Sequence, residues 1–202
     1  MKLSILICSL QEREGSLRKL LKSLNVGDAK SIPGGYYRTD IYDCGEYQVR
    51  VCIDQGVMSV GKKRNKLKEG VTARYLTYID DDDVITKDYL SEILAATDSG
   101  ADVIVYDVEM YDGKKHKYTV NYGKDLGGDW EKDNRAYRWP NHLMVWRTTL
   151  VKSVMFPNVS FGEDYMWARQ LKSRIKREHR INKVLYYYMF DADKTRTQQA
   201  RR

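Results

Sequence analysis

Four consecutive aspartates, Asp80 to Asp83, are the residues of this sequence whose type and spacing most clearly indicate chemistry. Adjacent carboxylates repel one another, so such a run is stable only when it is solvated or neutralised by a cation. Hard divalent cations bind carboxylate oxygens, and Mg²⁺ or Mn²⁺ often shares its ligands between a few aspartates and a substrate diphosphate. The run therefore predicts a site for a metal and a diphosphate, with a solvated acidic turn as the simpler alternative.

The residues on either side place this run at the end of a strand. Residues 75–79 are mostly β-branched or aromatic and have the composition of a buried strand. After the run, Thr86 is a candidate cap for a helix whose apolar face includes Leu90, Ile93 and Leu94. In an open α/β sheet, ligands bind at the carboxyl ends of the strands, and the aspartates are expected there.

Two further groups of polar residues suggest ligand binding. Asp54 follows a predicted strand, so it is expected near the acidic run, where it can hold the base or ribose of a nucleotide. Lys62, Arg64 and Asn65 belong to a short basic helix at 61–69. Its cations suit a diphosphate and its amide can orient a carboxylate, but a solvated basic helix explains these residues equally well.

A pair of carboxylates suggests catalysis. Glu163 and Asp164 follow a glycine at the start of a predicted helix that runs to about Ile175. One of them could remove a proton from a substrate. Acidic residues are also favoured at this position by the helix dipole alone, so the pair has a structural explanation as well.

Strands alternate with helices along the rest of the sequence. Predicted strands cover residues 3–8, 49–53, 75–79, 102–108 and 184–189, and predicted helices begin near 16, 61, 86 and 163. This alternation favours an α/β fold with a mostly parallel sheet and right-handed crossovers. Residues 27–46 contain four glycines and a proline and are predicted to form a loop.

A long polar segment with scattered aromatic residues, 112–141, is typical of a functional flap. We expect this flap to be mobile without ligand and to order over a bound ligand. Trp130, Trp139 and His142 are then expected to line the pocket of that ligand.

Length and composition indicate one domain with a proper core, since 42% of the 202 residues are hydrophobic. No window approaches a membrane span, and the N-terminus lacks a signal-peptide pattern. Three cysteines without paired spacing indicate reduced thiols, so we expect a cytoplasmic protein.

The net charge of +7 is unevenly distributed. Residues 165–202 hold eleven Lys and Arg against three acidic residues, a balance of +8, so the remaining chain sums to −1. A basic carboxyl-terminal part suggests ligands that carry phosphate, either a nucleotide or a nucleic acid. A solvated helix face explains each single residue equally well.

The order and spacing of these groups resemble the family 2 glycosyltransferases of the GT-A fold, over nearly the whole chain. The resemblance begins with Ser9-Leu-Gln-Glu12-Arg after the first strand and continues through Asp54. The acidic run is similar to the Asp-x-Asp element of that family. Arg64-Asn65 is similar to its Arg-Asn pair, and Glu163-Asp164 to its catalytic Glu-Asp motif. The chain departs from the family in having Cys8-Ser9 where Pro-Thr is common, and Asp54-Gln-Gly in place of Asp-Gly.

The resemblance implies a Rossmann-like GT-A domain over residues 1–202. Residues 1–110 would bind the nucleotide sugar, and residues 111–202 would supply the acceptor site and the catalytic base. The implied enzyme is a metal-dependent, inverting hexosyl- or pentosyltransferase that uses a nucleotide diphosphate sugar, with a UDP-sugar favoured. The sequence lacks the Gln-x-x-Arg-Trp signature of processive synthases, which favours transfer of a single sugar.

Roles for individual residues follow from the same resemblance. Asp164 would be the general base, and Glu163 would orient it. Mn²⁺ or Mg²⁺ would bind Asp82, with Asp80 and Asp191 as further ligands. The nucleotide sugar would contact Ser9, Glu12, Asp54, Lys62, Arg64, Asn65, Asp80 and Asp81. Trp130, Trp139 and His142 would line the pocket of the acceptor or the sugar, with the flap at 112–141 ordering over the donor or the acceptor.

Two other classes of function remain open on the sequence. The basic carboxyl-terminal part and the aromatic segment suit a nucleic-acid-binding module, although that leaves the four aspartates unexplained. A metal-dependent nucleotidyl or phosphoryl transferase would use the aspartates with two metal ions. The first two ideas also combine into one hypothesis, a glycosyltransferase whose acceptor is a hydroxylated base in DNA.

Overall fold

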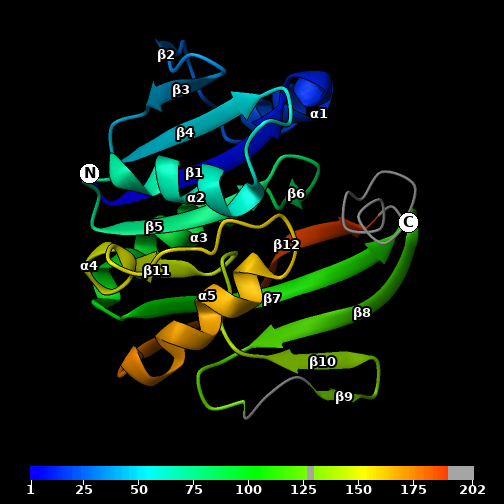
Figure 1. The fold of residues 1–202 in the computed structure, drawn as a ribbon. Coiled ribbons are helices and arrows are strands. Elements are labelled where there is room, and N and C mark those ends of the chain that lie inside the picture. The colour runs from blue at the N-terminus through cyan, green and yellow to red at the C-terminus, as the bar shows by residue number, and fades with distance from the viewer. Residues whose placement is uncertain (127–129, 191–202) are drawn as a thin grey trace.

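Three parallel strands near the amino terminus form the centre of the fold. In the computed structural model, which describes residues 1–126 and 130–190, β1 (Leu3–Leu10) lies between β4 (Tyr47–Asp54) and β5 (Tyr75–Asp80) (Figure 1). Their side chains are largely buried, because both faces of this part of the sheet are covered. All three strands were predicted from the sequence, with ends that agree within two residues.

Further strands extend the sheet on both sides of this centre. The order is β2-β3-β4-β1-β5-β11-β7-β8-β10-β9, and β12 pairs with β7 and β6. The parallel pairs are β1–β4, β1–β5, β7–β12 and β8–β10, and the remaining pairs are antiparallel. The bounds of the added strands are β2 Lys30–Pro33, β3 Tyr37–Asp43, β6 Val84–Ile85, β7 Val103–Asp112, β8 Lys115–Tyr122, β9 Trp130–Lys132, β10 Arg135–Arg138, β11 Val145–Arg147 and β12 Glu178–Phe190.

Helices cover both faces of this sheet, which confirms the predicted α/β class. Helix α2 (Val60–Glu69) contacts α5 (Glu163–Leu171), and both lie in front of the sheet in Figure 1, with α3 (Tyr89–Ala96) behind it. Helix α1 is Glu14–Ser23, and α4 is a single turn at Thr148–Val151. None of the helices in the described ranges is long and apolar enough to span a membrane.

The expected helix caps were wrong at two positions. Helix α1 begins two residues before Ser16, because a 3₁₀ turn at Gln11–Arg13 leads into it directly from β1. Helix α3 begins at Tyr89, after Thr86, and the Thr86 hydroxyl donates to Asp88 at 2.7 Å.

The predicted loop at 27–46 was wrong, because it contains an antiparallel hairpin of β2 and β3. Strand β3 pairs with β4 over its whole length, and Thr39 and Asp40 within it are buried. The pairing with β4 satisfies the backbone of a segment whose local composition favours turns. Pro33 ends the outermost strand, where a missing backbone N–H breaks no bond in the sheet.

The prediction of an irregular flap at residues 112–141 was also wrong, because strands of this segment pair with the sheet. Strands β8 and β10 continue the sheet beyond β7, and Val120, Tyr122 and Ala136 are buried. Because the sheet continues across residue 110, the proposed division into two functional halves falls inside β7. The mobility of this segment without ligand remains a prediction.

Candidate active site

The carboxyl ends of β1, β4 and β5 lie next to one another. The strand register pairs Cys8 with Asp80 and Leu10 with Asp54. Asp80 is the last residue of β5, and the acidic run continues from it into a turn. The polar residues that follow these three strands are therefore neighbours at one edge of the sheet.

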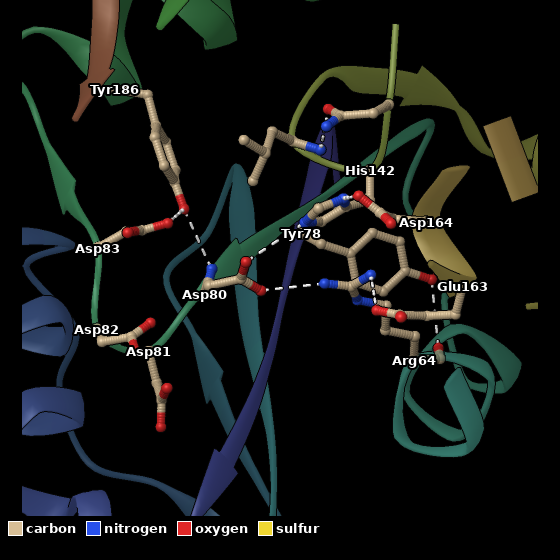
Figure 2. A network of polar contacts seen from close by, with 12 residues as sticks. Arg64, Tyr78, Asp80, Asp81, Asp82, Asp83, His142, Glu163, Asp164 and Tyr186 are labelled. Atoms are coloured by element: carbon tan, nitrogen blue, oxygen red, sulfur yellow. Dashed lines mark hydrogen bonds and ion pairs between the residues drawn. The ribbon is translucent and has the colours of Figure 1, made fainter. Parts of the chain in front are cut away.

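Arg64 is the central cation at this edge. Its guanidinium donates to Asp80 Oδ1 at 3.1 Å and to Glu163 Oε1 at 2.8 Å, as Figure 2 shows. The Arg64 side chain is only 4% exposed. Burial disfavours its charge, but the carboxylates of Asp80 and Glu163 outweigh burial and raise the pKa of Arg64. The guanidinium is therefore a permanent positive charge between two carboxylates that come from distant parts of the chain.

His142 makes a second link between the same two regions. Its Nε2 lies 3.4 Å from Asp80 Oδ2 and its Nδ1 lies 3.4 Å from Asp164 Oδ2 (Figure 2). Burial and the nearby Arg64 disfavour the charged imidazole, but Asp80 and Asp164 outweigh them and raise the pKa of His142. These four contacts connect five ionisable side chains in series, in the order Glu163, Arg64, Asp80, His142 and Asp164. The two ends of the series are adjacent in the sequence, and we call the five residues the charge ring.

The two adjacent carboxylates of the charge ring differ in access to solvent. Gly162 precedes them with φ of +72°, a conformation that glycine adopts freely, and α5 begins directly after it. The Glu163 side chain is 7% exposed, whereas that of Asp164 is 34% exposed. Burial raises the pKa of Glu163 above its usual value. At Asp164 the hydrogen bond and charge of His142 outweigh burial and lower the pKa. Asp164 is thus the more accessible carboxylate of the pair, with a pKa held below its usual value.

Asp81 and Asp82, which follow Asp80 in the acidic run, both contact Arg13. Asp81 accepts hydrogen bonds from the Ser9 hydroxyl at 2.6 Å and from Arg13 Nη1 at 2.9 Å. The same Arg13 nitrogen lies 2.9 Å from Asp82 Oδ2. Arg13 therefore neutralises part of the repulsion within the run.

The last aspartate of the run fastens the acidic turn to β12. Asp83 accepts hydrogen bonds from the Tyr186 hydroxyl at 2.6 Å and from the Met189 backbone N–H at 2.8 Å. The Tyr186 oxygen in turn accepts the backbone N–H of Asp80 at 3.2 Å (Figure 2). Burial, and then the charge of Asp80, raise the pKa of Asp83 well above its usual value. Asp83 is therefore a structural member of the run.

Asp82 is the member of the run with capacity for a cation. Its side chain is 42% exposed, against 4% for Asp81. Burial raises the pKa of Asp82 to about 6; Arg13 opposes this rise, and Asp80 and Asp81 add to it. Within residues 1–126 and 130–190, no three His, Cys, Asp or Glu side chains converge as a metal site. The exposed Asp82 carboxylate by itself offers oxygen donors of the type that hard cations prefer. Asp191, the other predicted ligand, lies outside the described residues.

Helix α2 also holds the segment that leads to Glu163 and Asp164. The Asn65 amide donates to the Phe156 carbonyl at 2.8 Å and accepts the Phe156 backbone N–H at 2.9 Å. At the start of the helix, the Gly61 N–H donates to the Val159 carbonyl at 3.1 Å. The Asn65 amide, predicted to contact the nucleotide sugar, is therefore engaged with the backbone that leads to Glu163 and Asp164.

Gly61→Ala is expected to lower the free energy of unfolding by about 1–3 kcal/mol, the usual cost of overpacking. A Cβ at Gly61 would overlap the carbonyl oxygen of Pro157. This oxygen belongs to the backbone, so it cannot move aside as the end of a flexible side chain could. Chemical denaturation measures the change. The matched control is Gly15→Ala on α1, where the added Cβ meets nothing within 4 Å. Equal stability of the two variants would contradict the close approach of α2 and the 157–159 backbone.

Among the predicted nucleotide-binding residues, Asp54 is buried, whereas Lys62 and Glu12 are exposed. The Asp54 carboxylate is fully buried, ion-paired with Lys63 and hydrogen-bonded to the Met58 N–H at 2.7 Å. Lys62 is exposed at the start of α2, and Glu12 is exposed in the turn after β1. Asp54 is therefore committed to contacts within the protein.

Of the three residues predicted to line a sugar or acceptor pocket, Trp130 lies far from the acidic run. Trp130 stacks on Tyr137 with ring centroids 3.9 Å apart, on strand β9 at the end of the sheet. Five strand spacings separate β9 from β5, roughly 24 Å at the usual spacing. The Lys172 ammonium lies 3.5 Å from the centre of the Trp139 ring. His142 contacts Asp80 and Asp164.

Sequence reasoning missed the roles of Arg13 and Tyr186. Arg13 belongs to the stretch after β1, but nothing in that stretch indicates that it reaches Asp81 and Asp82. Tyr186 is one of three consecutive tyrosines in β12. Only the pairing of β12 with β6 and β7 shows which of the three faces the acidic turn.

The family model described as Glycosyl transferase family 2 matches residues 40–174. The match covers two thirds of the chain and includes every member of the charge ring. A search of curated proteins finds no match.

Solved structures show the same fold at low sequence identity. S. aureus TarS 1-349 is 18% identical with a TM-score of 0.65, and the match covers 94% of this chain and 60% of that one. The crystal structure of the same TarS fragment in complex with UDP-GlcNAc matches with a TM-score of 0.64 and 17% identity, covering 94% and 59%. A197 from STIV matches at 14% identity with a TM-score of 0.52, covering 95% and 87%. The chain thus spans about three fifths of the TarS fragment.

Proposed function

Because this chain belongs to glycosyl transferase family 2, we propose that it transfers one sugar from a nucleotide diphosphate sugar to an acceptor hydroxyl. The charge ring carries the proposal, because it joins Asp80, beside the candidate diphosphate site, to Asp164, the candidate base. The crystal structures of TarS in complex with UDP and with UDP-GlcNAc support a UDP-sugar as the donor. Residues 1–110 would then bind the donor, and residues 111–202 would supply the base.

Asp164 would act as the general base. Its carboxylate takes the proton of the acceptor hydroxyl while the hydroxyl oxygen bonds to the anomeric carbon and the bond from that carbon to the diphosphate breaks. The leaving diphosphate takes the electron pair of the broken bond. With one base and no carboxylate assigned as nucleophile, the acceptor attacks from the face opposite the leaving group, and the anomeric carbon is inverted.

The leaving diphosphate would be stabilised at the acidic run. Asp82 would hold Mn²⁺ or Mg²⁺, and the bound cation would neutralise charge on the diphosphate. Asp80 was predicted as a further ligand, but its two oxygens contact Arg64 and His142. Lys62 and Arg64, both on helix α2, would add positive charge near the diphosphate.

Asp82→Ala is expected to abolish Mn²⁺-dependent nucleotide-sugar binding without unfolding the protein. The substitution removes the most exposed carboxylate of the acidic run, and that carboxylate holds no buried group in place. Isothermal titration of UDP-GlcNAc with and without Mn²⁺ measures the effect. The control is Asp125→Ala, which removes an 83% exposed carboxylate on a different loop. Unchanged metal dependence in Asp82→Ala would rule out this metal assignment.

The experiment that tests the proposed function is a thermal-shift screen of UDP-, GDP- and dTDP-sugars, with and without Mn²⁺. A ligand at one hundred times its Kd stabilises the folded state by about 2.7 kcal/mol, so the correct donor is recognised by its shift. Turnover of a nucleoside triphosphate without any response to nucleotide sugars would instead favour a nucleotidyl or phosphoryl transferase.

The identity of the acceptor is not assigned, and DNA is one candidate to be tested. Several basic residues of the carboxyl-terminal part are engaged within the fold. Arg180 pairs with Asp107, and Lys183 pairs with Asp88 and Glu92. These ion pairs reduce the charge available to a nucleic acid. Salt-sensitive retention on duplex DNA would support a DNA acceptor, and absence of binding at low salt would exclude it.

A further inference from the structure

Because Asp54 is buried, the nucleobase of the proposed donor cannot bind to it as the sequence predicted. Asp54 was predicted to hold the base or ribose, but its side chain is 0% exposed and bound to Lys63 and Met58. Removing it from those contacts would leave the Lys63 ammonium, itself 4% exposed, as an uncompensated buried charge. A nucleobase at this edge of the sheet must therefore be recognised by other side chains.

The hairpin of β2 and β3 brings a new aromatic residue to the same edge. The register places Tyr37 beside Asp54, Asp54 beside Leu10, and Cys8 beside Asp80. The turn before Tyr37 therefore lies three strand spacings from β5, roughly 14 Å away along the carboxyl edge. A nucleoside diphosphate whose phosphates lie at Asp82 can span that distance with its base.

The side chains along this row are exposed and suited to a base. The Tyr36 ring is 51% exposed, its hydroxyl accepts a hydrogen bond from the Lys62 ammonium at 3.4 Å, and that ammonium lies 5.9 Å from the ring centre. Between Tyr36 and the acidic run, the exposed amides of Gln55 and Gln11 are hydrogen-bonded to each other at 2.9 Å. Amides both donate and accept, so this pair can match the polar edge of a nucleobase.

Helix α2 connects Tyr36 to the carboxylates of the charge ring. Lys62, in its first turn, reaches Tyr36, and Arg64, half a turn later, reaches Asp80 and Glu163. One helix thus contacts both the catalytic carboxylates and the exposed tyrosine. A ligand that crosses the amino-terminal end of α2 would meet both.

We propose that Tyr36 is the platform on which the nucleobase of the donor stacks, with the amides of Gln11 and Gln55 contacting its polar edge. This inference rests on the proposed function and adds to it a base-binding residue from the β2–β3 hairpin. An exposed aromatic ring beside a cation is the usual arrangement for stacking a base, because every base presents a π-face.

Calorimetric titration of UDP and of inorganic pyrophosphate, each with Mn²⁺, tests the inference on Tyr36→Ala and Tyr36→Phe. Loss of a stacked base is expected to weaken UDP binding by Tyr36→Ala about 5- to 150-fold, with pyrophosphate binding unchanged. Tyr36→Phe retains the ring and is expected to bind UDP as the wild type does. Ile32→Ala, which truncates a 44% exposed side chain on the same hairpin, is the control for damage to the hairpin.

The outcomes separate this inference from the proposed function. Wild-type affinity of Tyr36→Ala for UDP would overturn the inference and leave the proposed function intact. Equal weakening of UDP and pyrophosphate, or a loss in Ile32→Ala as large as in Tyr36→Ala, would also overturn it. A wild-type protein that binds none of UDP, GDP or dTDP would overturn the proposed function, and the inference with it.

Discussion

Replacement of Asp164 by asparagine is expected to lower the rate of sugar transfer by roughly 10²-fold or more, on the usual scale of general-base contributions. Asparagine has nearly the same shape but cannot accept the proton of the acceptor hydroxyl. Asp164 is the more exposed of the two adjacent carboxylates, and His142 keeps it ionised. Donor and Mn²⁺ affinity are expected to stay at the wild-type level, because the acidic run is unchanged.

Glu163→Gln is the matched variant for this experiment. Glu163 is 7% exposed and bound to Arg64, so its amide analogue is expected to change stability more than the transfer step. The measurement is single-turnover transfer with saturating donor, alongside calorimetric donor affinity. Near-normal transfer by Asp164→Asn with a collapse in Glu163→Gln would show that Glu163 is the base. Near-normal transfer by both variants would remove this pair from the mechanism.

Arg64→Ala is expected to lower the free energy of unfolding by about 3–5 kcal/mol, the usual cost of removing one partner from a buried ion pair. The substitution leaves Glu163 buried with no cation in contact and leaves Asp80 with only His142. Urea denaturation followed by circular dichroism measures the loss. Sugar transfer is also expected to fall, because Arg64 joins α2 to the carboxylates of β5 and α5.

Two further variants provide reference values for the loss in free energy of unfolding expected for Arg64→Ala. Arg64→Lys keeps the charge, but a single ammonium cannot reproduce the two-pronged contact to Asp80 and Glu163, so an intermediate loss is expected. Arg18→Ala breaks a pair with Glu14 in which the side chains are 79% and 66% exposed, and its cost is expected to be at most about 1 kcal/mol. If Arg64→Ala is no more destabilising than Arg18→Ala, the charge ring contributes nothing to the stability of the fold.

The central strands and the acidic run were predictable because their signals are local. A strand buried on both faces needs a continuous apolar sequence, and the three central strands have it. The run at Asp80 to Asp83 follows the last of them without interruption. Neighbouring parallel strands end at a common edge, so the position of Asp54 near that run also followed from the sequence.

The segments that the sequence did not predict are stabilised by partners far away in the chain. The β2–β3 hairpin and the strands β8 to β10 have polar, glycine-containing sequences typical of loops. They become strands because the edges of β4 and β7 offer their backbones hydrogen bonds. Propensity describes a residue in isolation and does not include such an edge.

The sequence by itself determined which residues are available for chemistry: the four aspartates, the cations of α2, and the Glu163-Asp164 pair. The tertiary structure alone decided which of them keep accessible oxygens and which are engaged within the protein. Asp54 is buried against Lys63, Asp83 is bound by Tyr186, and Asp82 remains half-exposed. The physical reason is that a carboxylate binds a ligand most readily with oxygens that the protein leaves unsatisfied. Whether they are satisfied depends on arginines, tyrosines and backbone N–H groups that folding brings from about a hundred residues away.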